Sequence, residues 1–122
     1  MKTVLLVDDR DDCITTLDLA LEQLPGVVLR PMASAEAALE AMDHHPVAAV
    51  ITDIHLPNMT GLELITQIRR QHRFLTLPIL VVSADPDPAT PRNALQLGAN
   101  AFFLKPFSPG AVRRKLEELI NG

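Results

Sequence analysis

The sequence Val50-Ile51-Thr52-Asp53-Ile54-His55-Leu56-Pro57 places an aspartate at the end of an apolar run. The run begins at Ala48, and after the turn that contains Pro57 a helical pattern opens at Gly61. Such a run is compatible with a buried parallel strand that has Asp53 at its carboxyl end. Open α/β sheets bind ligands just outside the carboxyl ends of their strands. A lone aspartate in this position could equally cap the next turn, so the interpretation depends on the other strand ends.

Four further short apolar runs are interpreted as strands, at residues 3–7, 27–29, 78–82 and 101–104, beside the central run at 47–52. Helical spacing of apolar residues separates them, with Ser34 expected to cap the second helix. Thr90 is expected to cap a short fourth helix over 92–97, with Pro91 in its first turn. The fivefold alternation predicts an α/β fold, a parallel sheet with helices on both faces. Right-handed crossovers then bring all strand carboxyl ends to one edge.

Composition limits what the chain can be. At 122 residues, 48% of them hydrophobic, it is expected to form one globular domain over 1–122, complete or the N-terminal part of a longer protein. A formal net charge of −4 argues against broad binding to nucleic acid by this segment. The single cysteine, Cys13, excludes an internal disulfide. No apolar stretch is long enough for a membrane span or a signal peptide, which favours a soluble protein of the cytoplasm.

Three more strand ends carry side chains suited to chemistry at the predicted edge. Asp8 and Asp9 follow the first strand, Ser83 the fourth and Lys105 the fifth. The carboxylates of Asp8, Asp9 and Asp53 would repel one another if they converged at this edge. A hard cation such as Mg²⁺ relieves that repulsion. A carboxylate cluster with room for a phosphate suggests phosphoryl transfer, with Asp53 as nucleophile, Lys105 as positive charge and Ser83 as hydrogen-bond donor. Each residue alone also fits a plain strand-end role, and only the joint placement is specific.

This set of residues resembles the receiver domain of two-component response regulators over essentially the whole chain. The matching positions are Asp8-Asp9, Asp53, Pro57, Gly61, Ser83-Ala84 and Lys105-Pro106-Phe107. The resemblance implies a flavodoxin-like fold with strand order 2-1-3-4-5 and five helices. It also implies a phosphorelay function in which the domain is no ordinary enzyme, because it catalyses only its own phosphorylation and dephosphorylation.

The resemblance assigns roles to single residues. Asp53 accepts a phosphoryl group from a sensor histidine kinase, a phosphotransfer protein or a small phosphodonor. Mg²⁺ is expected on Asp8, Asp9, Asp53 and the backbone carbonyl of His55, with Asp9 the better candidate for direct ligand among the first two. Ser83, Lys105 and Phe102 are expected to couple phosphorylation to an output surface, formed by the fourth helix, fifth strand and fifth helix, that binds an output domain or partner protein.

Three features depart from the usual pattern. Phe102 has no hydroxyl where many relatives carry a tyrosine, and His55 stands where a methionine or asparagine is more usual. Prolines 86, 88 and 91 fall where the fourth helix normally begins. Two rival functions stay open: an aspartyl-nucleophile phosphatase, with His55 in place of the usual second aspartate, and an interaction module of the same fold that works without phosphorylation.

Overall fold

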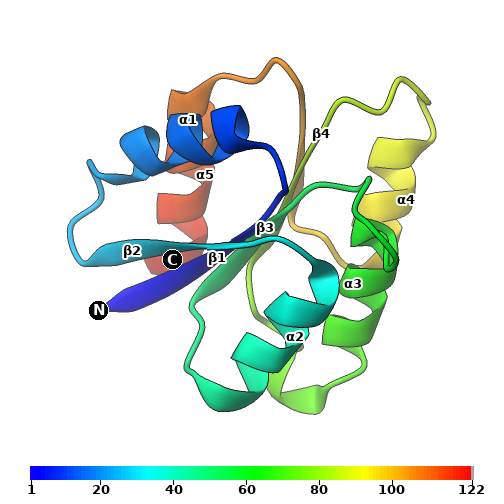
Figure 1. The fold of residues 1–122 in the computed structure, drawn as a ribbon, viewed down its shortest axis with the longest axis horizontal. Helices are drawn as coiled ribbons and strands as arrows, with labels where there is room; N and C mark the ends of the chain where they lie inside the picture. The colour runs from blue at the N-terminus through cyan, green and yellow to red at the C-terminus, as the bar shows by residue number, and fades with distance from the viewer. Residues whose placement is uncertain (122) are drawn as a thin grey trace.

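The computed structural model describes residues 1–121, which alternate between strands and helices. The strands are β1 (Lys2–Val7), β2 (Val27–Met32), β3 (Ala49–Thr52), β4 (Ile79–Ser83) and β5 (Ala101–Leu104). The helices are α1 (Asp11–Leu21), α2 (Ala35–His44), α3 (Gly61–Arg69), α4 (Thr90–Leu97) and α5 (Pro109–Asn121), with a short 3₁₀ turn, η1 (His72–Phe74), before β4. Five strands and five α-helices confirm the predicted α/β alternation (Figure 1).

The five strands form one parallel sheet in the order β2-β1-β3-β4-β5, which confirms the predicted topology. The register pairs Val7 with Thr52 and Ser83 with Leu104, so neighbouring strands end at nearly the same level. The residues that follow β1, β3 and β5 therefore share one edge of the sheet. That edge is where ligands of open parallel sheets bind.

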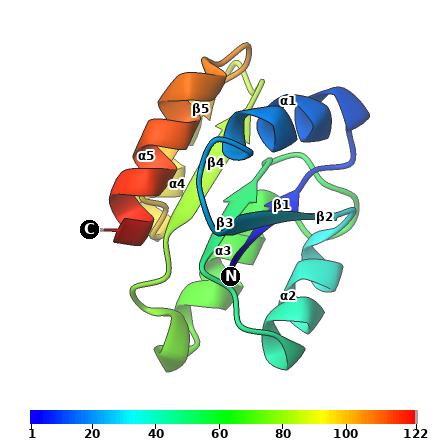
Figure 2. The same cartoon turned by 90° about the vertical axis from the view of Figure 1, so that its left-hand side faces the viewer.

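Two helical layers enclose the sheet (Figure 2). The apolar residues of α1 and α5 pack on one face, together with Val4 and Leu6 of β1. The apolar residues of α2, α3 and α4 pack on the other face, together with Leu5 and Val7. Because successive strand residues point to opposite faces, a strand covered on both sides is apolar throughout, which explains the unbroken aliphatic runs of β1, β3 and β4.

Local sequence signals account for several helix ends. The Ser34 hydroxyl accepts a hydrogen bond from Ala37 N at 3.1 Å, which confirms the predicted cap of α2. Thr60 and Glu63 form a reciprocal capping box at the start of α3. Gly98 ends α4 with φ at +121°, a conformation that other residues rarely adopt. No helix within residues 1–121 is long and apolar enough to cross a bilayer.

Two sequence expectations about element ends were wrong. β2 runs to Met32 instead of residue 29, because an edge strand tolerates Pro31, whose missing N–H is not needed for pairing on the open side. α4 begins at Thr90 itself, and the N-cap position belongs to Ala89, whose side chain accepts no hydrogen bond. Pro91 does lie in the first turn of this helix, as expected.

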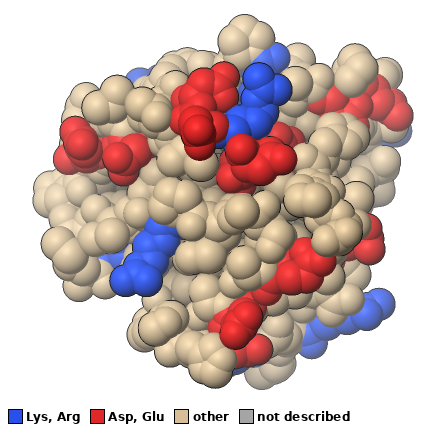
Figure 3. All heavy atoms as spheres, viewed as in Figure 1, with Lys and Arg blue, Asp and Glu red and all other residues tan. Residues whose placement is uncertain are grey.

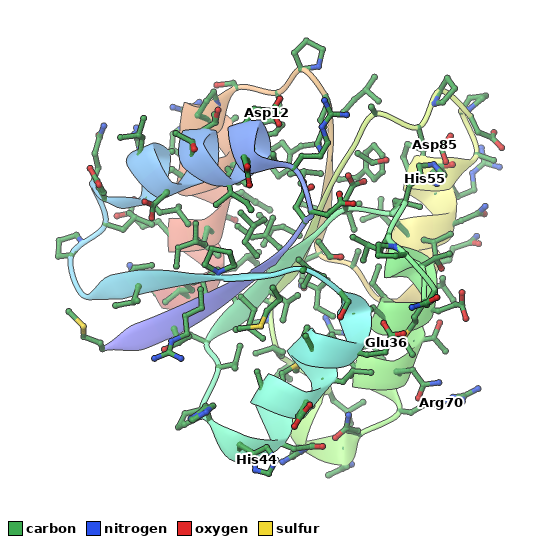
Figure 4. All side chains as sticks on the ribbon, in the orientation of Figure 1. Asp12, Glu36, His44, His55, Arg70 and Asp85 are labelled. Carbon is green, nitrogen blue, oxygen red and sulfur yellow. The ribbon has the colours of Figure 1, made fainter. Side chains whose placement is uncertain are left out.

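The three arginines at the end of the third helix include one that does not point into solvent. By their spacing in the sequence, Arg69, Arg70 and Arg73 are expected on the polar, solvated face of that helix. Instead the Arg69 guanidinium is half-buried and donates to backbone and side-chain oxygens of later segments. Arg73 belongs to η1, where it lies over the Phe74 ring with 4.4 Å between the guanidinium carbon and the ring centroid. Arg70 and Arg73 are both exposed, and Figure 4 shows Arg70 pointing outward.

Candidate functional site

Asp53 follows β3 directly and is only 7% exposed. Its backbone N–H donates to Val7 O at 3.0 Å, which fixes the residue against the end of β1. Its two carboxylate oxygens have separate partners: Oδ1 accepts from Ile54 N at 2.6 Å, and Oδ2 lies 3.0 Å from Lys105 Nζ. The second oxygen is therefore held in place by the Lys105 side chain at the carboxyl-terminal edge of the sheet.

Lys105 connects two buried carboxylates. Its ammonium donates to Asp8 Oδ2 at 3.1 Å as well as to Asp53. Asp8 is 1% exposed, and its other oxygen accepts from Arg10 N at 2.9 Å. Burial lowers the pKa of Lys105, but hydrogen bonds and attraction from Asp53 and Asp8 outweigh that effect and raise the pKa overall. The ammonium thus stays charged at neutral pH and neutralises part of the carboxylate pair.

Asp9 differs from its neighbour, because it is exposed where Asp8 is buried. Among residues 1–121, no three side chains of the histidine, cysteine, aspartate or glutamate type lie close enough together to hold a metal ion by themselves. The expected convergence of three carboxylates is therefore seen for two, Asp8 and Asp53, with the Lys105 ammonium between them. Figure 3 shows acidic and basic side chains side by side over the end of β1 and the start of α1.

Ser83 ends β4 and is fully buried. Its Oγ accepts a hydrogen bond from Asp85 N at 3.1 Å, and its carbonyl accepts from Lys105 N at 2.8 Å. β4 lies between β3 and β5 in the sheet, so the serine sits between the strands that carry Asp53 and Lys105. The peptide bond between Lys105 and Pro106 is cis.

Gly61 lets α3 approach the site closely. A Cβ atom at this position would meet the carbonyl of Asp53 and come within 2.9 Å of the Ile54 Cα. The Gly61 N–H donates to Ile54 O at 2.8 Å, so the backbone after Asp53 and the start of α3 are in direct contact. Only a residue without a side chain fits here.

Comparison with known proteins accounts for this arrangement. The family model of the response regulator receiver domain matches residues 4–117. The chain belongs to the response regulator receiver domain family. A chemotaxis protein CheY homologue of Campylobacter jejuni is 34% identical over 91 residues, covering 71% of this chain and 70% of the relative.

Two solved structures are similar to this receiver domain. A response regulator from Chloroflexus aurantiacus has 32% sequence identity and a TM-score of 0.88, with 99% of this chain and 98% of that one covered. The receiver domain of a sensor histidine kinase from Pseudomonas aeruginosa PAO1 has 26% identity and a TM-score of 0.86, with 99% and 98% covered. The Pseudomonas structure has a magnesium ion coordinated in its active site cleft.

A contact that the sequence did not suggest links two loops of the receiver domain above this edge. His55 Nε2 lies 3.1 Å from Asp85 Oδ2, and Figure 4 shows the two side chains facing one another beside the start of α4. The His55 side chain remains 69% exposed, while that of Asp85 is 16% exposed. The pKa of Asp85 is lowered, chiefly by the hydrogen bond from the Asp87 backbone, and further by Thr90 and His55. The only sequence signal was position, since His55 stands two places after Asp53 and Asp85 stands two places after Ser83.

The two phenylalanines of β5 lie on opposite sides of the sheet. Phe102 is half-buried and packs on the core beneath α2, α3 and α4, whereas Phe103 packs on the core beneath α1 and α5. Phe102 pairs in register with Val81 of β4. Its ring therefore belongs to the layer that contains α4. This placement is compatible with the expected coupling of Phe102 to the output surface, which stays a prediction.

A cavity of about 520 Å³ opens next to Lys105. Its walls come from α1 and from the chain after β5, and they include Cys13, Thr16, Lys105 and Phe107. Burial raises the pKa of the Cys13 thiol to about 12, and a hydrogen bond to Asp8 adds to the effect. The thiol is thus a neutral packing group at the wall of this cavity.

Proposed function

We propose that this receiver domain accepts a phosphoryl group on Asp53 and passes the change on to a partner surface. The observation that supports this most is the 3.0 Å contact between Asp53 Oδ2 and the Lys105 ammonium. The contact joins a nearly buried carboxylate to a fixed positive charge, and Asp53 stands where the backbone turns out of the sheet. A nucleophile beside a cation suited to phosphoryl oxygens is what phosphoryl transfer requires.

The reaction forms one bond and breaks one bond. A carboxylate oxygen of Asp53 bonds to phosphorus, while the bond from phosphorus to the donor's imidazole nitrogen, or to the acyl oxygen of a small phosphodonor, breaks and leaves its electron pair on the donor. The Lys105 ammonium faces the charge that develops on the phosphoryl oxygens, and the Ser83 hydroxyl can donate to one of them. The chain acts on itself, and the same carboxylate is restored when water removes the group.

The donor set at this edge fits magnesium. Asp8, Asp9 and Asp53 offer carboxylate oxygens and His55 offers its backbone carbonyl, and hard cations prefer such oxygen ligands. Since the described side chains alone supply no closed cluster of three, water and phosphoryl oxygens would complete the shell. Bound magnesium supplies positive charge that offsets the repulsion between carboxylates and phosphate. The magnesium seen in the Pseudomonas receiver domain supports the assignment.

The partners follow from the same proposal. The phosphodonor is a sensor histidine kinase or a phosphotransfer protein in the cytoplasm. The output surface consists of α4, β5 and α5, where Leu95, Leu97 and Leu104 are exposed apolar side chains. Ser83 and Phe102 would connect the phosphorylated edge to this surface. We also propose that this segment makes no direct contact with nucleic acid or with a membrane.

Intact-mass measurement with acetyl phosphate tests the phosphoacceptor. The wild-type protein should gain one phosphoryl group in the presence of Mg²⁺ and none with a chelator. Asp53→Asn should gain none, whereas Asp18→Asn, which changes an exposed acid on α1, should behave as wild type. Labelling of Asp53→Asn at the wild-type rate would overturn the assignment, and steady turnover of a phosphate monoester would favour the phosphatase alternative.

A further inference from the structure

Arg10 stands at a helix position that its side chain does not favour. It is the N-cap residue of α1 and makes no side-chain cap hydrogen bond. Serine, threonine, aspartate and asparagine are preferred at this position, and a cation interacts unfavourably with the positive end of the helix dipole. Such departures from local preference are expected where a residue has a functional task. The stability of α1 therefore explains Arg10 poorly, and the surroundings of its guanidinium explain it better.

The guanidinium of Arg10 is exposed and loosely held. Its Nε lies 3.6 Å from Asp12 Oδ1, which is longer than a hydrogen bond, and the two side chains are 67% and 76% exposed. Asp12 is held by its own helix, because its Oδ1 accepts a hydrogen bond from Cys13 N at 2.9 Å. Exposed ion pairs at such separations stabilise a fold little. The guanidinium can therefore turn towards a ligand without breaking a buried contact.

Arg10 lines the cavity of about 520 Å³ that opens next to Lys105. Thr16 of α1, Phe107 of the chain after β5 and Ala84, the residue that follows β4, also contribute to its walls. Small-molecule sites occupy about 300–1,000 Å³ and combine apolar walls with a few polar groups, as this cavity does. The cavity can therefore hold a small organic group directly beside the phosphorylation site.

Two cationic side chains and one acidic side chain line this cavity. The Lys105 ammonium is already shared between Asp8 and Asp53, at 3.1 and 3.0 Å. Asp12 is the acid, and the Arg10 guanidinium is the cation beside it. Because the charge of Lys105 is engaged by two carboxylates, Arg10 is the group that can meet a negative charge developing inside the cavity.

We propose that this cavity receives the acyl group of a small acyl phosphate, and that Arg10 selects such donors. The inference rests on the proposed phosphorylation of Asp53 and adds the class of small phosphodonor that the site prefers. An Asp53 oxygen bonds to phosphorus while the bond from phosphorus to the acyl oxygen breaks, and the electron pair stays on the departing carboxylate. The departing group thereby gains a negative charge, which the Arg10 guanidinium stabilises as it develops.

Phosphoramidate provides the comparison, because its leaving group carries no negative charge. Its protonated nitrogen keeps the electron pair of the broken bond to phosphorus and departs as neutral ammonia, so Arg10 has no developing negative charge to stabilise. The same Asp53, Lys105 and Mg²⁺ serve both donors, and a change in metal affinity or in the fold therefore alters the two rates alike. The ratio of the two rates isolates the effect of Arg10 on the leaving group.

Phosphorylation rates of the full chain with Mg²⁺ at constant ionic strength, followed by intact mass, test the selection. Arg10→Gln should slow labelling by acetyl phosphate about fivefold, as expected for one exposed charge contact, and should leave labelling by phosphoramidate within about twofold of wild type. Arg10→Lys keeps the charge and should preserve the wild-type ratio of the two rates. Arg70→Gln is the matched control, because Arg70 is an exposed arginine that points outward in Figure 4. Beryllofluoride, a phosphoryl mimic without a leaving group, should bind the wild type and Arg10→Gln alike.

A second pair of variants tests whether the acyl group enters the cavity. Thr16→Phe narrows the cavity from an exposed position of α1, whereas Thr15→Phe adds the same side chain at the exposed neighbour outside the cavity wall. Relative to phosphoramidate, labelling by benzoyl phosphate, which has a larger acyl group, should fall at least about fivefold in Thr16→Phe and stay at the wild-type level in Thr15→Phe. Melting temperatures and circular dichroism establish that each variant is folded.

Failure of this inference can be told apart from failure of the proposed function. If no donor labels the wild type in the presence of Mg²⁺, the proposed function fails and the cavity has no reaction to serve. If the wild type is labelled but Arg10→Gln changes both rates equally, or neither, Arg10 does not select the donor and phosphorylation stands. Unchanged labelling of Thr16→Phe by benzoyl phosphate would place the acyl group outside the cavity and would likewise overturn the inference.

Discussion

The Lys105 ammonium meets the Asp53 carboxylate at 3.0 Å although the strands that carry them are not neighbours. β4 lies between β3 and β5, so the lysine reaches across one strand end to contact the aspartate. This is possible because Ser83, which ends β4, is small and buried and its carbonyl accepts a hydrogen bond from the Lys105 N–H. The same reach brings the ammonium to Asp8, beyond β3.

Replacing Lys105 by methionine should destabilise the fold and block the phosphoryl response. Two buried carboxylates would lose their charged donor, and an unsatisfied buried group costs about 1–3 kcal/mol. Because the pKa of Lys105 is raised above its ordinary 10.5, the stabilisation is complete below that pH and is lost as pH rises through the higher folded value. Urea unfolding with a chelator should therefore show a constant deficit for Lys105→Met up to about pH 10 that shrinks in more alkaline solution.

Lys115→Met is the matched control for this lysine. Lys115 forms an ion pair with Glu118 on the surface of α5, with 3.6 Å between the charged atoms. Surface pairs of this kind contribute about 0–1 kcal/mol, so the control should unfold close to wild type. Equal losses in the free energy of unfolding for the two variants would mean that the contacts of Lys105 with Asp53 and Asp8 stabilise the fold no more than a surface ion pair does.

Gly61→Ala should damage the site and the fold together. The new methyl group would press on the Asp53 carbonyl and the Ile54 Cα, which are backbone atoms with no room to move away. Overpacking of this kind costs about 1–3 kcal/mol, and the shifted aspartate should take up phosphate more slowly. Urea unfolding and the rate of labelling with acetyl phosphate measure the two effects.

Gly110→Ala provides the contrast, because the nearest atom to a Cβ there is the end of the flexible Arg114 side chain, at 3.2 Å. Gly110 lies in α5, where alanine is the better helix former by about 1 kcal/mol. The two glycine variants should therefore move the free energy of unfolding in opposite directions. If Gly61→Ala leaves the free energy of unfolding unchanged, α3 can move away from the loop that follows Asp53 at no energetic cost.

Cys13 should be unreactive in the folded protein. Burial and the neighbouring Asp8 raise its thiol pKa to about 12, so almost no thiolate exists at pH 8. Alkylation by iodoacetamide at that pH should be at least about 100-fold slower than in urea, because the thiolate is the reacting form. The free energy of unfolding should fall as pH rises from about 9 towards 12, because the thiol of the unfolded chain loses its proton at a lower pH than the thiol of the folded chain. Cys13→Ala should lack that part of the pH dependence, and rapid alkylation of the native protein would contradict the buried placement.

The fold was predictable because each strand contains a short apolar run, unbroken and aliphatic in β1, β3 and β4, that is bounded by turn and helix signals. Strand order and the two helical layers followed from alternation together with the family resemblance. The meeting of Asp8, Asp53 and Lys105 at one edge of the sheet was predictable because each residue stands at a strand end, while their chemical roles stay predictions.

The rest depends on side-chain contacts that have no local signal. The attachment of Arg69 to Gly98 joins residues 29 positions apart, and an arginine on a polar helical face looks the same in sequence whether it is solvated or bonded. The His55–Asp85 contact likewise depends on how two loops face one another. The helix start at Thr90 was misplaced because a run rich in proline and aspartate fits a cap at either of two neighbouring residues.

Phe102 should become more buried when the site is occupied by beryllofluoride. Movement of Ser83 towards a phosphoryl oxygen would free space beside β5, and the half-buried ring already packs on the core beneath α2, α3 and α4. An apolar ring should fill that space more readily than a tyrosine, whose buried hydroxyl would need a partner. Fluorine resonances of fluorophenylalanine-labelled protein measure the change through their solvent isotope shifts, and Phe103, on the opposite face of the sheet, is the internal control.

Phe102→Ala should separate uptake of the phosphoryl group from its transmission. The apolar ring donates no hydrogen bond to Asp53 and accepts none from Lys105, so labelling with acetyl phosphate should proceed within about twofold of wild type. The equilibrium between the two states should shift less on phosphorylation than in the wild type. Amide shift changes on α4 and β5 should shrink in this variant, because the space beside β5 would be left unfilled. If Phe102 is equally buried in both forms and no amide on that face moves, the ring plays no part in switching and the domain signals through another surface.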